Sequence, residues 1–238
     1  MPEEERPLQQ QQRGRDIHNM LSNVESVETK LQRIAEKARR DPKCQFTSLF
    51  HLMNRDLLWE CFWQLKENRA SGVDRVTKEQ YAENLMENLD DLIGRLHRMA
   101  YIPQPVRRVY IPKPGSEKKR PLGIPVLEDK LVQAGLSEIL QAVYEQDFID
   151  DSYGFRPGRS CHDALRTLSQ TIDRQGTQYI VEADIKGFFD NVDQDQLMDF
   201  LAHLIADKRV LRYIKRFLKA GIQEDNVYRA SDTGTPQG

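Results

Sequence analysis

The stretch VEADIKGFFDNVD, Val181 to Asp193, places an aspartate directly after a run of residues that alternates like a strand. From Tyr179 onward, successive side chains would face opposite sides of a sheet, which puts Asp184 at the carboxyl end of the predicted strand. Open α/β architectures commonly hold ligands at the carboxyl ends of their strands. Asp184 is therefore a candidate ligand-binding residue. The alternative is that it starts a turn, as aspartates often do.

Helices are predicted on both sides of this strand from apolar residues at helical spacing and from N-cap residues such as Asn54, Thr77 and Asp193. They cover residues 17 to about 40, 54 to about 70, 77–96, 128–144, 161–174, 193–204 and 208–220. The first dozen residues are rich in Glu and Gln, and we expect them to be disordered. The last stretch, NVYRASDTGTPQG, is expected to begin as a strand and end in a turn.

A basic β-hairpin is predicted between Val106 and Pro125. Two β-type runs, RRVYI and RPLGI, flank the segment PKPGSEKK, in which Pro114 and Gly115 signal a turn. Four prolines in the hairpin would interrupt a central strand, so we expect it to project from a sheet edge.

Composition excludes several classes of protein. No window of about 18 apolar residues occurs, and the first 16 residues lack the pattern of a signal or transit peptide, so we predict a cytoplasmic protein without membrane association. The 3 cysteines and 5 histidines are scattered, which argues against a disulfide framework and against a zinc site.

Charge is distributed unevenly along the chain, although its net value is only -2. Eight basic residues and one acidic residue lie between Arg95 and Arg120, whereas six acidic residues and one lysine lie between Glu182 and Asp199. The first segment suits phosphate groups and the second suits cations. The alternative for both is a solvated surface.

Four blocks in this order resemble the reverse transcriptases encoded by bacterial group II introns, the intron maturases: YIPKPGSEKKRPLGIPVLEDKLVQ, SYGFRPGRSCHDAL, ADIKGFFDNVD and GTPQG. The resemblance implies an α+β right-hand polymerase fold, in which helix-rich fingers with a basic β-hairpin precede an incomplete palm sheet. The implied divisions are an N-terminal extension (1–46), fingers (47–160) and a partial palm (161–238).

The resemblance also implies a magnesium-dependent site. Nucleotidyl transfer uses two Mg²⁺ ions about 3.5 to 4 Å apart, and magnesium prefers hard oxygen ligands. Asp184 matches the first catalytic aspartate of the family, and Ile185 would supply a backbone carbonyl to a metal. Phe189 matches the aromatic residue that excludes a 2′-hydroxyl, which implies a DNA product; the alternative for Phe189 is core packing.

Further residues match nucleotide contacts of the family. Lys113 and Arg120 match the fingers residues that grip the triphosphate of the incoming dNTP, a role that suits their positive charge. A solvated hairpin tip is the alternative. Gln237, in the block TPQG, matches a residue that lines the nucleotide pocket.

Nucleic-acid contacts are expected at two places. Arg156 and Arg159 in GFRPGRS are candidate contacts to the template backbone, and local hydrogen bonds within a turn are the alternative. Arg39 and Arg40 end the first predicted helix, where they suit the helix dipole and equally an RNA backbone. The implied partners are intron RNA template, DNA primer and dNTPs.

One part of the family pattern is missing from the 238 residues. The sequence YxDD, whose two aspartates complete the metal site in the family, occurs nowhere in the chain, and the LDD at Leu89 to Asp91 falls inside a predicted helix. One carboxylate cannot organise two divalent ions. We therefore expect an N-terminal fragment with little or no polymerase activity alone, and a separate polypeptide is a candidate source of the remaining palm and thumb.

Two other functions remain open from the sequence. The chain could be a non-catalytic RNA-binding fragment that assists intron splicing. It could also be a metal-dependent nuclease or phosphatase that uses Asp184, although Asp190 and Asp193, the nearby carboxylates, are explained by a turn and a helix cap.

Overall fold

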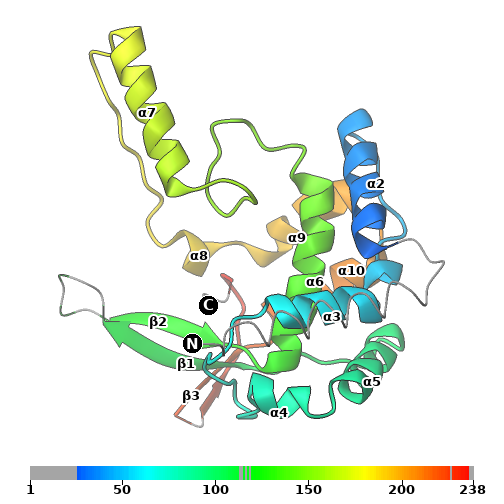
Figure 1. The fold of residues 1–238 in the computed structure, drawn as a ribbon. Helices are drawn as coiled ribbons and strands as arrows, with labels where there is room; N and C mark the ends of the chain where they lie inside the picture. Colours follow the sequence, from blue (N-terminus) through cyan, green and yellow to red (C-terminus); the bar gives the residue numbers. More distant parts are fainter. Residues whose placement is uncertain (1–25, 113–114, 116, 118, 226, 236–238) are drawn as a thin grey trace, which may run out of the picture.

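A computed structural model describes residues 26–112, 115, 117, 119–225 and 227–235 of the chain. It is a mixed structure of helices with a small sheet at one side (Figure 1). The helices are α2 (Val27–Arg40), α3 (Arg55–Gln64), α4 (Lys78–Ala82), α5 (Leu85–His97), α6 (Leu127–Tyr144), α7 (Cys161–Gln175), α8 (Phe188–Asn191), α9 (Gln194–Leu204) and α10 (Lys208–Leu218). A 3-10 turn, η1, covers Phe50–Leu52. Within the described ranges, no helix is long and apolar enough to cross a membrane.

The sheet has the order β2-β1-β3-β4, with β1 (Val106–Pro112), β2 (Lys119–Ile124), β3 (Ile222–Glu224) and β4 (Val227–Arg229). The predicted hairpin is confirmed: β1 and β2 pair antiparallel, with Val109 opposite Leu122. The hairpin projects from the body of the molecule (Figure 1). At its base β1 pairs in parallel with β3, so the sheet joins residues on both sides of the predicted boundary at residue 160.

The core is formed by α3, α5, α6 and α10, whose apolar residues recur at helical spacing and meet in the centre. Its largest buried side chain is Tyr213 of α10, which stacks on Phe50 with ring centroids 5.4 Å apart. The Tyr213 hydroxyl donates a 3.0 Å hydrogen bond to the carbonyl of Leu96 at the end of α5. Residues far apart in sequence therefore share one core.

A buried carboxylate fixes α10 against the start of this core. Asp207, the N-cap of α10, is 3% exposed and accepts hydrogen bonds from the amides of Leu49 and Phe50, each 2.8 Å long. It also accepts from the amide of Arg209. Burial alone would raise the pKa of Asp207, but these amide donors outweigh it and hold the pKa below its usual range.

A second buried carboxylate, Asp129 in the first turn of α6, ties that helix to the segment before the hairpin. It accepts a 2.6 Å hydrogen bond from the Tyr101 hydroxyl and a 3.0 Å bond from the Gln104 amide. Desolvation dominates here and raises the pKa of Asp129 to about 6. Asp129 therefore takes up a proton at a higher pH than Asp207.

Several helix boundaries differ from the sequence prediction. The expected start of the first helix at residue 17 lies outside the described residues, and α2 begins at Val27, where the Ser26 hydroxyl accepts from the Thr29 amide. The single helix predicted over 77–96 is wrong, because Asn84 leaves the helical conformation and separates α4 from α5. The helix predicted from 54 to about 70 is shorter than expected: α3 ends at Gln64, because Leu65 has an extended backbone conformation.

The strand predicted from Tyr179 to Asp184 is also wrong, since the structure has no strand between residues 177 and 185. An alternating run forms a strand only when a neighbouring strand supplies hydrogen bonds, and the described strands all lie at the hairpin. Tyr179, Ile180 and Val181 are accordingly 68% to 91% exposed. The helix before them, α7, stands apart from the helical core (Figure 1).

Candidate functional site

Asp184 and Ile185 lie in an exposed connection that leads into the short helix α8. Within the described ranges, no group of three or more His, Cys, Asp or Glu side chains could hold a metal ion. Among the described residues, Asp184 therefore belongs to no carboxylate group of the size that a pair of magnesium ions needs, and this donor set does not fit such a pair.

Phe189 is held close to the turn that ends the described chain. The Thr235 amide donates a 2.8 Å hydrogen bond to the Phe189 carbonyl, and the Gly234 amide donates a 2.8 Å bond to the Val192 carbonyl. The Phe189 side chain is 42% exposed and lies edge-on to Phe188 with centroids 5.5 Å apart. The Phe189 side chain is therefore not fully packed in the core, which was the alternative to a nucleotide contact.

Gly234 permits this close approach. A Cβ at position 234 would lie 2.6 Å from the Phe189 carbonyl oxygen and 2.8 Å from that of Asp190, and Gly234 has a φ of +74°. Only glycine tolerates both the contact and the left-handed backbone without strain. Gln237, the predicted nucleotide contact further along, lies outside the described residues.

Gln194 is a functional candidate that the sequence did not single out. Its side chain is 5% exposed, and its amide donates to the Gly234 carbonyl at 2.9 Å and to the Leu218 carbonyl at 3.2 Å. The amide thereby links the turn at Gly234 to the end of α10. The residue follows the N-cap Asp193, and nothing in its local sequence distinguishes it from an exposed first-turn glutamine.

The base of the hairpin faces the same turn across a cavity of about 90 Å³. Its lining includes Arg108 and Gly123 from the hairpin, Asp190 from α8, and Thr233 to Thr235 from the turn. The Nε of Arg108 is buried, and no hydrogen-bond partner for it lies in the described part of the chain. The cavity is much smaller than the ~300 Å³ of a typical small-molecule site, so it does not hold a nucleotide in this conformation.

The two predicted triphosphate contacts lie on the hairpin. Arg120 is exposed in β2, where it pairs with Ile111 across the strands. Lys113 lies outside the described residues. The structure thus places Arg120 on the projecting part of the hairpin, and the assignment of both residues to a triphosphate stays a prediction.

Arg156 is engaged within its own turn. Its side chain is 6% exposed, and both Nε and Nη2 donate to Glu145 Oε1, at 3.0 and 2.8 Å. Its Nη1 donates to the carbonyls of Ile149 and Ser152, and its guanidinium stacks on Phe148. This geometry favours the local alternative over a template contact, because a phosphate would have to displace these acceptors.

The other predicted nucleic-acid contacts have more exposed side chains than Arg156. Arg159 is 26% exposed; it donates to the Asp150 backbone carbonyl and carboxylate, and stacks on Tyr153. At the end of α2, Arg39 donates a 3.0 Å hydrogen bond to Gln146 Oε1, and Arg40 is exposed. Their contact with a template or another RNA stays a prediction.

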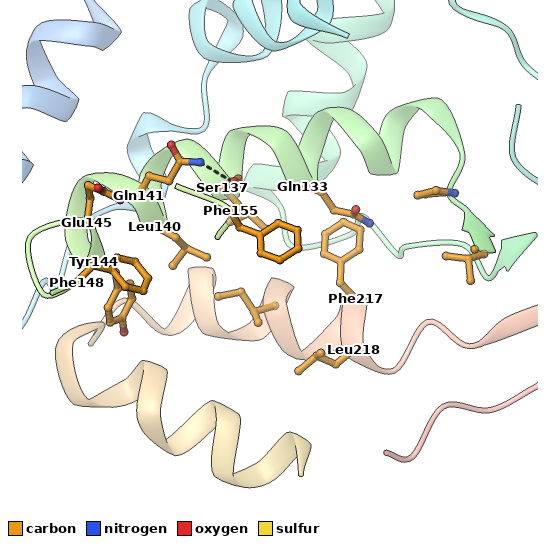
Figure 2. Close-up of a pocket in the computed structure, with 15 residues that line it drawn as sticks. Gln133, Ser137, Leu140, Gln141, Tyr144, Glu145, Phe148, Phe155, Phe217 and Leu218 are labelled. Carbon is orange, nitrogen blue, oxygen red and sulfur yellow. Dashed lines mark hydrogen bonds between the residues drawn. The ribbon is translucent and has the colours of Figure 1, made fainter. Parts of the chain in front are cut away.

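An apolar cavity of about 560 Å³ lies between α6 and α10. Figure 2 shows Leu140, Tyr144, Phe148 and Phe217 around it, with the ring of Phe155 at the rim. Among the residues that line it there is no predicted site residue. It is a gap in packing beside the core, separate from the candidate site.

Comparison with known proteins gives one family and several relatives. The family model described as "Reverse transcriptase (RNA-dependent DNA polymerase)" matches residues 111–238. The group II intron-encoded protein LtrA of Lactococcus lactis subsp. cremoris is 38% identical over 87% of this chain and 35% of its own length.

Two further relatives match a similar part of the chain. Protein YkfC of Escherichia coli (strain K12) is 35% identical over 87% of this chain and 56% of its own length. An uncharacterized 91 kDa protein in the cob intron of Schizosaccharomyces pombe is 37% identical over 79% of this chain and 23% of its own length. The chain thus spans between about a quarter and just over half of the length of these relatives.

Proposed function

Because the chain belongs to the reverse transcriptase (RNA-dependent DNA polymerase) family, we propose that it supplies the fingers and part of the palm of a reverse transcriptase of the group II intron type. Its ligands are then an intron RNA template, a DNA primer and dNTPs. Such an enzyme is a nucleotidyltransferase, and this one would act in the cytoplasm.

The observation that carries the proposal is the hydrogen bond from the Thr235 amide to the Phe189 carbonyl. It joins the block ADIKGFFDNVD to the block GTPQG, and both blocks lie within the segment that matches the family model. The base of the hairpin, which carries a third block, borders the same turn. Three segments whose sequences resemble the family therefore lie together. If the resemblance of each block were accidental, there would be no reason for the three to be neighbours in the fold.

Individual roles follow the resemblance. Asp184 would serve as one catalytic carboxylate and magnesium ligand, with the Ile185 carbonyl beside it. Phe189 would exclude ribonucleotides by its bulk, and its partial exposure leaves the ring accessible for this. Arg120 would neutralise charge on the triphosphate.

The metal site needs more than the described residues supply. Since Asp184 belongs to no group of three or more potential ligands there, we propose that the remaining ligands come from outside residues 26–235, for example from a second polypeptide with the rest of the palm and the thumb. The exposed apolar run Tyr179 to Val181 is a segment that such a partner could pair with. The chain alone would have little or no polymerase activity.

A second candidate is RNA binding without catalysis, in support of intron splicing. The absence of a metal-binding group among the described residues favours it. Both candidates require RNA binding, but only the first requires recognition of a primer terminus.

A binding comparison tests the proposal. We expect the chain to bind an RNA template annealed to a DNA primer at least several-fold more tightly than the same RNA alone, measured by fluorescence anisotropy at fixed salt. Equal affinity for both would support the non-catalytic candidate. Lack of binding to either would contradict both.

A further inference from the structure

Helix α10 has two faces of opposite character. Val210, Tyr213 and Leu218 are buried in the core. The outer face and the C-cap residue Lys219 together carry four exposed cations in one line, which we call the α10 row: Lys208, Arg212, Lys215 and Lys219. Their spacing of four, three and four residues places them on one side of the helix. From Lys208 to Lys219 the row covers twelve positions, which are eleven steps of the helix or about 16 Å.

The α10 row borders an open hollow of about 510 Å³. Leu211 of α10 and Met198 of α9 are its apolar lining, and the four cations of the row and Arg216 complete it. We do not include Arg216 in the row, because its guanidinium donates hydrogen bonds to the carbonyls of Met99 and Tyr101 within the fold. The hollow therefore combines an apolar surface with a rim of positive charge.

Ion pairs within the chain do not account for the row. Lys215 lies 3.5 Å from Asp195 and Lys219 lies 3.4 Å from Asp232, but these acids are 87% and 85% exposed. Such solvent-exposed pairs contribute little to stability. In the part of the chain that the structure describes, no ion pair is formed by Lys208 or Arg212.

Helix stability accounts for only part of the row. Lys208 is the first residue of α10, and the first turn contains no acidic residue. The dipole of a helix favours acids at this end and cations at the other. Lys215 near the carboxyl end is explained by the dipole, whereas Lys208 stands where a cation is unfavourable.

We propose that the α10 row binds the sugar–phosphate backbone of an RNA strand. One nucleic-acid strand carries a phosphate about every 3.4 Å along a duplex axis, so a line of about 16 Å spans four to five phosphates. Four cations on a chain with a net charge of -2 form a local positive surface. The apolar lining from Leu211 and Met198 suits the sugars and base faces between phosphates.

The row is fixed in position relative to the candidate site. Gln194 donates to Leu218 at the end of α10 and to Gly234 in the turn beside Phe189. An RNA strand on the row would therefore lie on an element that is anchored to the site. The choice of RNA over an acidic protein rests on the proposed function, because the charge pattern alone fits either polyanion.

The test compares two triple variants with equal loss of charge. One is Arg212→Gln/Lys215→Gln/Lys219→Gln, in the row. The control is Lys43→Gln/Lys66→Gln/Arg174→Gln, at exposed positions elsewhere. Fluorescence anisotropy with a labelled single-stranded RNA 20-mer, without metal or dNTPs, gives affinity and its salt dependence, and circular dichroism checks that both variants fold.

We expect the row variant to bind RNA at least tenfold more weakly at 100 mM salt, and the control to stay within about threefold of the wild type. Each lost phosphate contact should reduce the slope of log K against log salt by about 0.7, so three contacts reduce it by about 2. If the wild type binds RNA but the row variant keeps the same affinity and salt slope, the proposal is overturned. An equal loss of affinity in the control variant would overturn it too. Tighter binding of poly-glutamate than of RNA would also overturn it. If the wild type binds no RNA, the proposed function fails as well.

Discussion

The buried side chain of Gln194 donates a 2.9 Å hydrogen bond to the backbone carbonyl of Gly234. The same amide nitrogen reaches the carbonyl of Leu218 at 3.2 Å. One side chain from the start of α9 thereby holds both the end of α10 and the turn that contacts Phe189. The candidate site depends on this contact, because the amide connects the turn to the helical core.

We predict that Gln194→Ala lowers the free energy of unfolding by about 1–2 kcal/mol, because it leaves two buried carbonyls without this donor. The matched control is Gln196→Ala, two residues along the same helix, where the side chain is exposed. Urea denaturation measures both. A Gln194→Ala effect no larger than that of the control would show that the amide does not fix the turn.

Gly234→Ala tests the close approach of the turn to α8. The added Cβ would lie 2.6 Å from the Phe189 carbonyl oxygen, and we expect a loss of about 2–4 kcal/mol in unfolding free energy. Gly158→Ala is the control, since Gly158 has a similar φ of +68° and an added Cβ there would meet nothing within 4 Å. The difference between the two variants isolates the contact from backbone strain, and equal losses would refute the contact.

Asp207→Ala should destabilise the fold by about 2–4 kcal/mol, because it leaves the amides of Leu49 and Phe50 buried without an acceptor. The folded-state pKa of Asp207 is lowered, so its contribution is present above the unfolded pKa of about 3.9 and is lost as pH falls through the folded value. Asp173→Ala, at an exposed position, should have little effect. Comparable losses in the two variants would exclude this role.

Asp129 should give the opposite pH dependence. Its folded-state pKa is raised to about 6, above the unfolded value of about 3.9, so the folded state binds more protons between these values. The contribution of Asp129 is therefore most favourable below about pH 4 and declines as pH rises through 6, by up to about 3 kcal/mol. Denaturation midpoints from pH 4 to 7.5 should show this slope in the wild type, and Asp129→Asn should reduce it; an unchanged slope would contradict the assignment.

Local sequence signals predicted those parts of the fold that local interactions determine. The N-caps Asn54, Thr77 and Asp193 each accept the predicted backbone amide hydrogen bonds, because a cap depends on residues only three positions away. The hairpin from Val106 to Ile124 is likewise confirmed, as its turn and its two β-type runs are contiguous in the sequence.

Tertiary contacts determined the parts that were missed. The run from Tyr179 has the period of a strand but lacks a partner strand in the described part of the chain, so its pattern alone did not produce one. For Arg156 the sequence left a template contact and local hydrogen bonds open; the contact stays a prediction, and the local alternative is favoured by Glu145, eleven positions earlier, which accepts from the guanidinium. The sequence around Gln194 did not indicate its buried role, because the two carbonyls that accept from its amide lie 24 and 40 positions away.

The most direct measurement for the proposed function is extension of a primed RNA template in the presence of Mg²⁺ and dNTPs. The chain is combined with a polypeptide that carries the remaining palm, including a Tyr-x-Asp-Asp turn, and the thumb of an intron-encoded relative. We predict no extension by either part alone, extension by the combination, and loss of at least 100-fold in rate with Asp184→Asn. Asp199→Asn, an equal change of charge at an exposed position of α9, should retain activity. Extension that persists in Asp184→Asn, or that never appears with the wild-type combination, would contradict the account.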